Sequence, residues 1–229
     1  GFFYRIFLGH TFGEENVGLY QLVFPVYALG ISFSCAGTEL ALSRCVAQEN
    51  AAGHPEKAKE LLKTGLIFTF VLSCILTIFL QHNAHMTAIS FLHDSRCEEL
   101  LILLSYTFPF ASIHSCICGY SLGLKQTKIP AVSQLFEQTF RILFVFLFCY
   151  YRTSHQLDLS ISFAVVGLAM GEIFASCYCL YSIHHTASKQ VQNLLSASTF
   201  CIHLSRLFRH AFPLTASRVL LNILQSIEA

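Results

Sequence analysis

The sequence predicts an all-α fold, a polytopic helix bundle in a membrane. The first observation is composition, because 54% of the residues are hydrophobic and only 12% are charged. The second is a rhythm of apolar stretches separated by short polar links, each stretch close to the roughly 20 residues that cross a bilayer. Soluble domains of this size rarely combine these features. A net charge of +1 also lacks the basic excess of nucleic-acid binders, so no nucleic-acid partner is expected.

The apolar stretches place the helices in order. The expected spans are 1–12, 19–46, 61–80, 100–122, 129–151, 159–183 and a last one from about 208. We therefore expect a six-helix transmembrane lobe over 1–184 with its first helix truncated. An amphipathic linker over 185–207 is expected to lie in the cytoplasmic interface, and 208–229 to start a second lobe. Both ends fall inside apolar patterns, so a fragment of a longer protein is expected.

Orientation follows from the lysines and arginines of the links, which are enriched on the cytoplasmic side of a membrane. The basic links are those that contain Arg44, Lys57, Lys59, Lys63, Lys125, Lys128, Lys189, Arg206 and Arg209. The alternate links carry only Arg96 and Arg152. The loops near Glu14, Asp94 and Arg152 are therefore expected outside.

Cysteines and histidines do not predict a cofactor or a metal. Most of the ten cysteines fall inside apolar runs, where they act as small hydrophobes. Cys116 and Cys118 are two residues apart, as are Cys177 and Cys179, and this spacing points each pair to different faces of its helix. Of the eleven histidines only His114 lies well inside a predicted helix, so no ligand cluster is expected.

Ionisable residues at membrane depth are costly and are therefore candidates for function. They are Arg5, Glu39, Glu137, Arg141, Glu172, Arg218 and Glu228. Glu137 and Arg141 are four residues apart with the acid first, which favours a pair on one helix face. That pair is expected to be structural, with proton transfer as the alternative. Glu172 follows Gly167 and Gly171, and it is expected to satisfy a helix contact or else to carry a proton.

Arg5 and Arg218 are the candidate anion-binding residues, because a guanidinium can hold phosphate oxygens in a bidentate manner. The alternative is that each arginine neutralises an acid, Glu39 or Glu228. Glu39 has no oppositely charged residue within four positions, so we expect its partner on another helix, with Arg5 the first candidate. Motifs for phosphate cradles, metalloproteases and serine nucleophiles are absent from the sequence, which argues against an enzyme.

Several short strings, in this order, resemble one transporter family. They are 1–8 (GFFYRIFL), 18–25 (GLYQLVFP), 42–50 (LSRCVAQEN), 119–125 (GYSLGLK), 130–138 (PAVSQLFEQ) and 212–218 (FPLTASR). The chain resembles the polysaccharide-biosynthesis flippases, and more narrowly the stage V sporulation protein B family. That family belongs to the multidrug/oligosaccharidyl-lipid/polysaccharide (MOP) superfamily, which includes lipid II flippases and multidrug and toxin extruders.

The resemblance implies two lobes around a central cavity that opens alternately to either side of the bacterial cytoplasmic membrane. It further implies a polyprenyl-pyrophosphate-linked sugar as substrate, with Arg5 and Arg218 on helices that line the cavity, and no cofactor; Glu39 is the third candidate substrate-binding residue. Glu39 stands where the family usually has an apolar residue or proline, so its role is inferred from depth and charge. A cation-coupled drug or metabolite antiporter and a non-transporting scaffold are the alternatives, and the coupling ion stays open.

Overall fold

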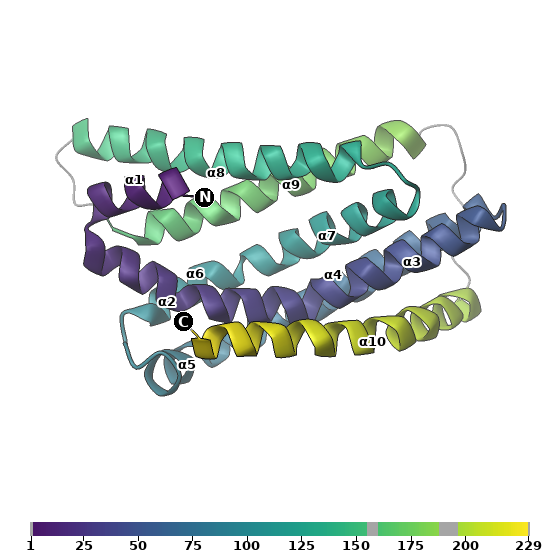
Figure 1. Cartoon of the computed structure of the whole chain (residues 1–229), viewed down its shortest axis with the longest axis horizontal. Coiled ribbons are helices and arrows are strands. Elements are labelled where there is room, and N and C mark those ends of the chain that lie inside the picture. The colour runs from purple at the N-terminus through teal and green to yellow at the C-terminus, as the bar shows by residue number, and fades with distance from the viewer. Residues whose placement is uncertain (1, 155–159, 188–196, 229) are drawn as a thin grey trace.

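The computed structural model describes residues 2–154, 160–187 and 197–228, and these residues form helices and short connections without a strand. The all-α expectation is therefore confirmed (Figure 1). The helices are α1 (Phe2–Phe12), α2 (Glu14–Ile31), the π-helical η1 (Ser32–Ala36), α3 (Gly37–Ala51), α4 (Pro55–His82), α5 (Ala84–Ser90), α6 (Cys97–Ser105), α7 (Thr107–Gly123), α8 (Lys128–Ser154), α9 (Ser162–Ala187) and α10 (Ala197–Glu228).

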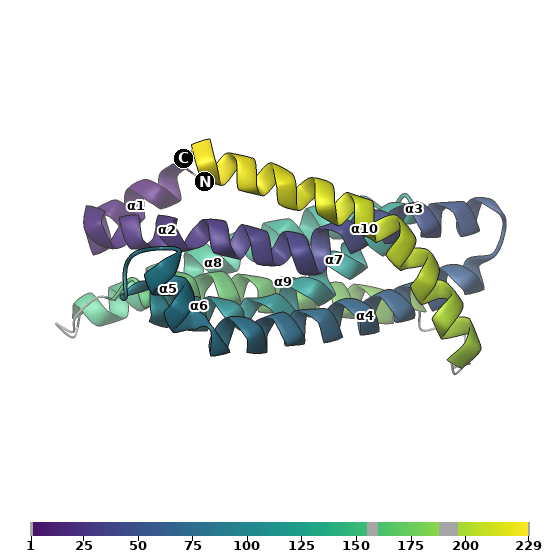
Figure 2. The same ribbon diagram turned by 90° about the horizontal axis from the view of Figure 1, so that it is seen from below.

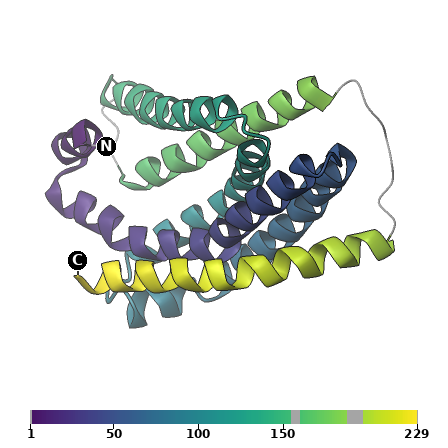
Figure 3. The same cartoon turned by 45° about the vertical axis from the view of Figure 1, so that its right-hand side comes forward.

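The long helices run side by side along the longest axis of the molecule. Helices α8 and α9 pack against each other on one side, while α3, α4 and α10 pack on the other (Figures 1 and 3). Helix α7 contacts both groups, because it packs on α3, α4 and α9. A view turned by 90° shows α10 crossing the bundle obliquely, and its N-terminal part contacts α4 (Figure 2). Helix α7 is thus the central element of the bundle.

Membrane length is confirmed for the central spans. Four helical stretches of the described chain are long and apolar enough to cross a bilayer, namely 14–51, 55–82, 128–152 and 162–184. The pair α6 and α7, bent by 41°, would be a fifth. Many large apolar side chains on these helices are exposed, including Ile75, Ile78 and Phe79 of α4. An exposed apolar surface of this kind suits hydrocarbon as the surrounding solvent.

The bend between α6 and α7 follows from Pro109. Proline has no N–H, so it cannot donate to the carbonyl four residues earlier, and its ring also crowds that carbonyl. That carbonyl belongs to Ser105, the last residue of α6, and it accepts a hydrogen bond from Thr77 Oγ1 of α4 at 3.0 Å instead. A hydroxyl of a neighbouring helix therefore replaces the missing donor, as a membrane interior requires.

Two loops predicted on the same side of the membrane meet at one end of the bundle. Arg96 Nη1, just before α6, donates to Glu15 Oε1 at the start of α2 at 2.6 Å. The same guanidinium donates to Asp94, and it holds the pKa of that carboxyl below its usual range. The predicted loop after the first helix is shorter than expected, since Gly13 alone separates α1 from α2, with a φ of 82° that favours glycine.

Helix α10 differs from the predicted linker. The segment 197–207, expected as an interfacial helix, is continuous with the predicted last span, and residues 188–196 of the linker lie outside the described residues. Leu207 is fully buried, His203 Nε2 lies 3.1 Å from Glu60 Oε2 of α4, and Arg206 pairs with Glu49 of α3. Leu207 of the amphipathic segment therefore packs on α3 and α4, while Ile202 and Phe208 are exposed, and a position of this segment in the membrane interface stays a prediction.

Glycines let α8 and α9 approach closely, which gives a first prediction. A Cβ on Gly171 would lie 2.7 Å from the backbone oxygen of Glu137, whereas one on Gly18 would meet nothing within 4 Å. We expect Gly171→Ala to lower the free energy of unfolding in detergent by about 1–3 kcal/mol, because backbone must move. Gly18→Ala is the matched control and should be neutral or stabilising by up to about 1 kcal/mol. Equal effects of the two variants would contradict the close helix contact.

Candidate functional site

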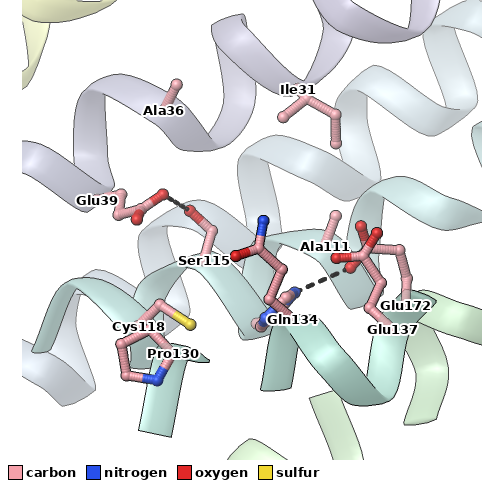
Figure 4. A pocket seen from close by; sticks show the side chains of 11 residues that line it. Ile31, Ala36, Glu39, Ala111, Ser115, Cys118, Pro130, Gln134, Glu137 and Glu172 are labelled. Atoms are coloured by element: carbon pink, nitrogen blue, oxygen red, sulfur yellow. Dashed lines mark hydrogen bonds and ion pairs between the residues drawn. The ribbon is translucent and has the colours of Figure 1, made fainter. Parts of the chain in front are cut away.

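A polar cavity of about 280 Å³ lies between the two sides of the bundle, against α7. Its walls come from the α2, η1 and α3 stretch, from α7, and from α8 and α9 (Figure 4). The lining residues are Ile31, Ala36, Glu39, Ala111, His114, Ser115, Cys118, Pro130, Gln134, Glu137 and Glu172. Three of these carry carboxyl groups, and none of these described lining residues is Lys or Arg. The cavity is therefore acidic.

Glu172 of α9 is the most buried carboxyl in the cavity, with 7% of its surface exposed. Its Oε2 lies 3.1 Å from His114 Nδ1 of α7, and its Oε1 accepts from the Tyr27 hydroxyl of α2 at 3.4 Å. On its other side, His114 Nε2 lies 3.0 Å from Ser133 Oγ of α8. This chain of hydrogen bonds joins four helices through groups that would otherwise be unsatisfied in an apolar interior.

The predicted pair of Glu137 and Arg141 is formed. Arg141 Nη2 donates to Glu137 Oε1 along α8, and the two side chains are only 14% and 13% exposed. Figure 4 shows Glu137 beside Glu172 at the same wall of the cavity. Arg141 therefore supplies positive charge beside two carboxyls, and its buried Nε has no hydrogen-bond partner among the described residues.

Glu39 of α3 lies at another wall of the same cavity. It accepts a hydrogen bond from Ser115 Oγ of α7 at 2.8 Å (Figure 4). The ion pairs found in the described part of the chain do not join it to an arginine, although Arg218 of α10 lies within electrostatic range. The expected partner Arg5 lies in α1, but its side chain is outside the described part of the structure, as is that of Glu228.

Of the seven sequence-predicted candidates, the structure thus brings Glu39, Glu137 and Glu172 to the wall of one cavity, with Arg141 paired to Glu137 beside it. Arg218 is exposed on α10 near Glu39. Sequence reasoning missed His114, Tyr27, Ser115 and Ser133, which hold the carboxyls in place. His114 was the one histidine deep in a predicted span, and that depth was the available signal; its link to Glu172 joins distant segments, which no local pattern reveals.

Helices of membrane length around a buried, charged cavity define a multi-pass membrane protein. Comparison with known proteins places it more narrowly: the chain belongs to the polysaccharide biosynthesis protein family, whose profile matches residues 1–229. Stage V sporulation protein B of Bacillus subtilis is 27% identical over 225 residues, which cover 97% of this chain and 43% of that protein. Lipid II flippase MurJ of the same organism is 27% identical over 153 residues, covering 63% of this chain and 28% of that protein.

A solved structure supports the fold independently of close sequence similarity. An inward-facing multidrug resistance MATE family transporter of the MOP superfamily matches with a TM-score of 0.65 at 16% identity. The match covers 93% of this chain and 48% of that one. The chain therefore spans about half the length of the proteins that it resembles, and the MATE-like fold expectation is confirmed.

Proposed function

We propose that this chain is one half of a flippase that moves a polyprenyl-pyrophosphate-linked sugar, an oligosaccharide or a peptidoglycan precursor, across a membrane by alternating access. Family membership and the similarity to a lipid II flippase support this proposal. The observation that carries it is a polar cavity and an apolar cavity on two faces of the same helical stretch. Such a pair suits a substrate that has a large polar head and a long apolar tail.

The apolar cavity lies next to the acidic one. It has a volume of about 330 Å³ and is lined by Val26, Leu29, Gly30, Phe33, Leu76, Phe79, Leu80, Thr87, Phe91, Phe108 and Val219. Gly30 lines the apolar cavity, while its neighbour Ile31 lines the polar one. The helical stretch 26–39 and helix α7 therefore each contribute walls to both cavities. In this proposal the polyprenyl tail occupies the apolar cavity. Moving the tail there from the surrounding lipid costs little free energy, because both environments are apolar.

Arg218, Arg5 and Glu39 are proposed to receive the head group. Arg218 is exposed and makes none of the described ion pairs, so its guanidinium is available for charge-assisted bonds to phosphate. Glu39 then accepts hydrogen bonds from sugar hydroxyls beside it. The buried Glu137, Arg141 and Glu172 are proposed as a structural or proton-carrying group that responds to which side of the membrane the cavity faces.

The acidic lining favours a second candidate, a cation-coupled antiporter for drugs or metabolites. Carboxyl groups and the aromatic Tyr27 attract cations. None of the described residues that line the polar cavity is an arginine, which could bind a phosphate. Both candidates need alternating access, so the nature of the cargo separates them. A scaffold without transport is the third outcome.

The experiment uses the full-length protein that contains this chain, purified and placed in liposomes, and three matched compounds. We expect the polyprenyl-pyrophosphate sugar to bind and to cross the membrane, while the lipid-free sugar pyrophosphate and the plain polyprenol each bind at least about tenfold more weakly, since each fills one cavity only. Transport of organic cations driven by a proton or sodium gradient, without binding of the lipid-linked sugar, would favour the antiporter. If the protein shows neither of these activities, the result would favour the scaffold.

A further inference from the structure

Two cysteines far apart in the sequence meet the central histidine inside the bundle. Cys118 of α7 and Cys179 of α9 are both buried, and the Sγ atoms of both and one ring nitrogen of His114 lie within 4.8 Å of one another. In the sequence, the nearest cysteine to Cys118 is Cys116, and the nearest to Cys179 is Cys177, in each case on the same helix. Packing of α7 on α9 instead pairs cysteines across the helices.

The hydrogen bonds of His114 orient it as a metal ligand. Glu172 Oε2 lies 3.1 Å from Nδ1, so the carboxylate accepts the Nδ1 proton and the lone pair of Nε2 is directed to the other side. That side holds Ser133 Oγ at 3.0 Å from Nε2, and the same oxygen lies 3.6 Å from Cys118 Sγ. A carboxylate behind a histidine is the arrangement that fixes the tautomer and raises the basicity of zinc-binding histidines.

From this geometry we propose that His114 Nε2, Cys118 Sγ and Cys179 Sγ bind one zinc ion, with Glu172 as the group that orients the histidine. Two sulfurs and one imidazole are ligands that Zn²⁺ prefers. Bonds of about 2.0–2.3 Å place tetrahedral ligand atoms about 3.3–3.8 Å apart. The three atoms therefore need to approach one another by at most about 1.5 Å from the 4.8 Å limit.

Charge and access also suit zinc at this place. Binding forms two Zn–S bonds and one Zn–N bond, and the two thiols release two protons to water in the polar cavity. The product, Zn²⁺ with two thiolates and a neutral imidazole, has no net charge, which an apolar interior tolerates far better than a free ion. His114 and Cys118 line the cavity, so the metal has a path in, and a cavity water or Ser133 Oγ completes the fourth position.

The site would join the centre of the bundle to one of its sides. It bridges α7 and α9, with Ser133 of α8 beside it. This role goes beyond the proposed transport, because it requires neither a sugar nor a lipid. Its test also stands apart from transport, since the readout is metal binding by the protein alone.

The test is a titration of the reduced, purified protein in detergent with Zn²⁺ against a chromophoric chelator, and with Co²⁺ as a spectroscopic probe. We expect one equivalent of Zn²⁺ per chain and a thiolate-to-cobalt charge-transfer band. Cys118→Ser and Cys179→Ser should each weaken zinc binding at least about tenfold and reduce that band, and Glu172→Gln should weaken binding about 10- to 100-fold while the band persists.

Cys177→Ser is the matched control, because Cys177 lies two residues from Cys179 on the same helix but is exposed. Its zinc affinity should stay within about twofold of the parent. If size-exclusion chromatography shows that a serine variant does not fold, Cys118→Ala or Cys179→Ala replaces it in the titration. A parent without the charge-transfer band, a band lost equally in Cys177→Ser, or a Cys118–Cys179 disulfide that reforms in place of metal binding would each overturn the proposal.

Discussion

Replacing Arg218 with alanine is expected to weaken binding of a polyprenyl-pyrophosphate sugar by about 10- to 100-fold, close to the 1.5–3 kcal/mol typical of hydrogen bonds to charged groups. Arg218 is exposed on α10 and lies within electrostatic range of Glu39. The Arg218 guanidinium makes none of the described ion pairs, so its N–H groups can donate to the phosphate oxygens of the substrate. Binding to the detergent-solubilised protein, measured with a labelled lipid-linked sugar, gives the comparison.

Two variants distinguish recognition from general charge. Arg209→Ala removes an exposed arginine from the same helix, and its effect on affinity should be less than about twofold. Arg218→Lys keeps the charge but loses the planar fork, so an intermediate loss is expected. If Arg209→Ala weakens binding as much as Arg218→Ala, the arginines act only through the net charge of the helix, and Arg218 is not a head-group contact.

The sequence predicted the helices well because their signal is local. Length and hydropathy are properties of one segment, so the spans at 61–80, 129–151 and 159–183 correspond to α4, α8 and α9. The end of the linker was harder, since an amphipathic helix has one apolar face whether that face meets lipid or, like Leu207, another helix.

The site was only half predictable for the same reason. Charge at membrane depth singled out Glu39, Glu137, Arg141 and Glu172 without knowledge of their contacts, and the helical spacing alone paired Glu137 with Arg141. The contact of His114 with Glu172 and the approach of Cys118 to Cys179 depend on how α7 packs against α9. Spacing within one helix assigned Cys116 and Cys118, and likewise Cys177 and Cys179, to different faces of their helices, but it gave no information on the facing helix.

Replacing Arg141 with methionine is expected to lower the free energy of unfolding by about 3–5 kcal/mol. Loss of the guanidinium leaves the Glu137 carboxylate, 13% exposed, without its partner and close to the second carboxylate of Glu172. An unpaired buried charge is far more costly than the absence of the whole pair. Unfolding in detergent, followed by helical circular dichroism against denaturant concentration, measures the change.

The double variant Glu137→Gln/Arg141→Met separates a cost of charge from a cost of packing. It removes both charges and keeps most of the side-chain volume, so it should recover most of the stability that Arg141→Met loses. Lys59→Met supplies the exposed reference: Lys59 pairs with Glu56 one turn away at 3.8 Å, with 31% and 58% of the side chains exposed, and its loss should cost no more than about 1 kcal/mol. A similarly small cost for Arg141→Met would mean that water reaches Glu137 freely and solvates its carboxylate. Glu137 and Glu172 would then lack the burial on which their proposed role as a structural or proton-carrying group depends.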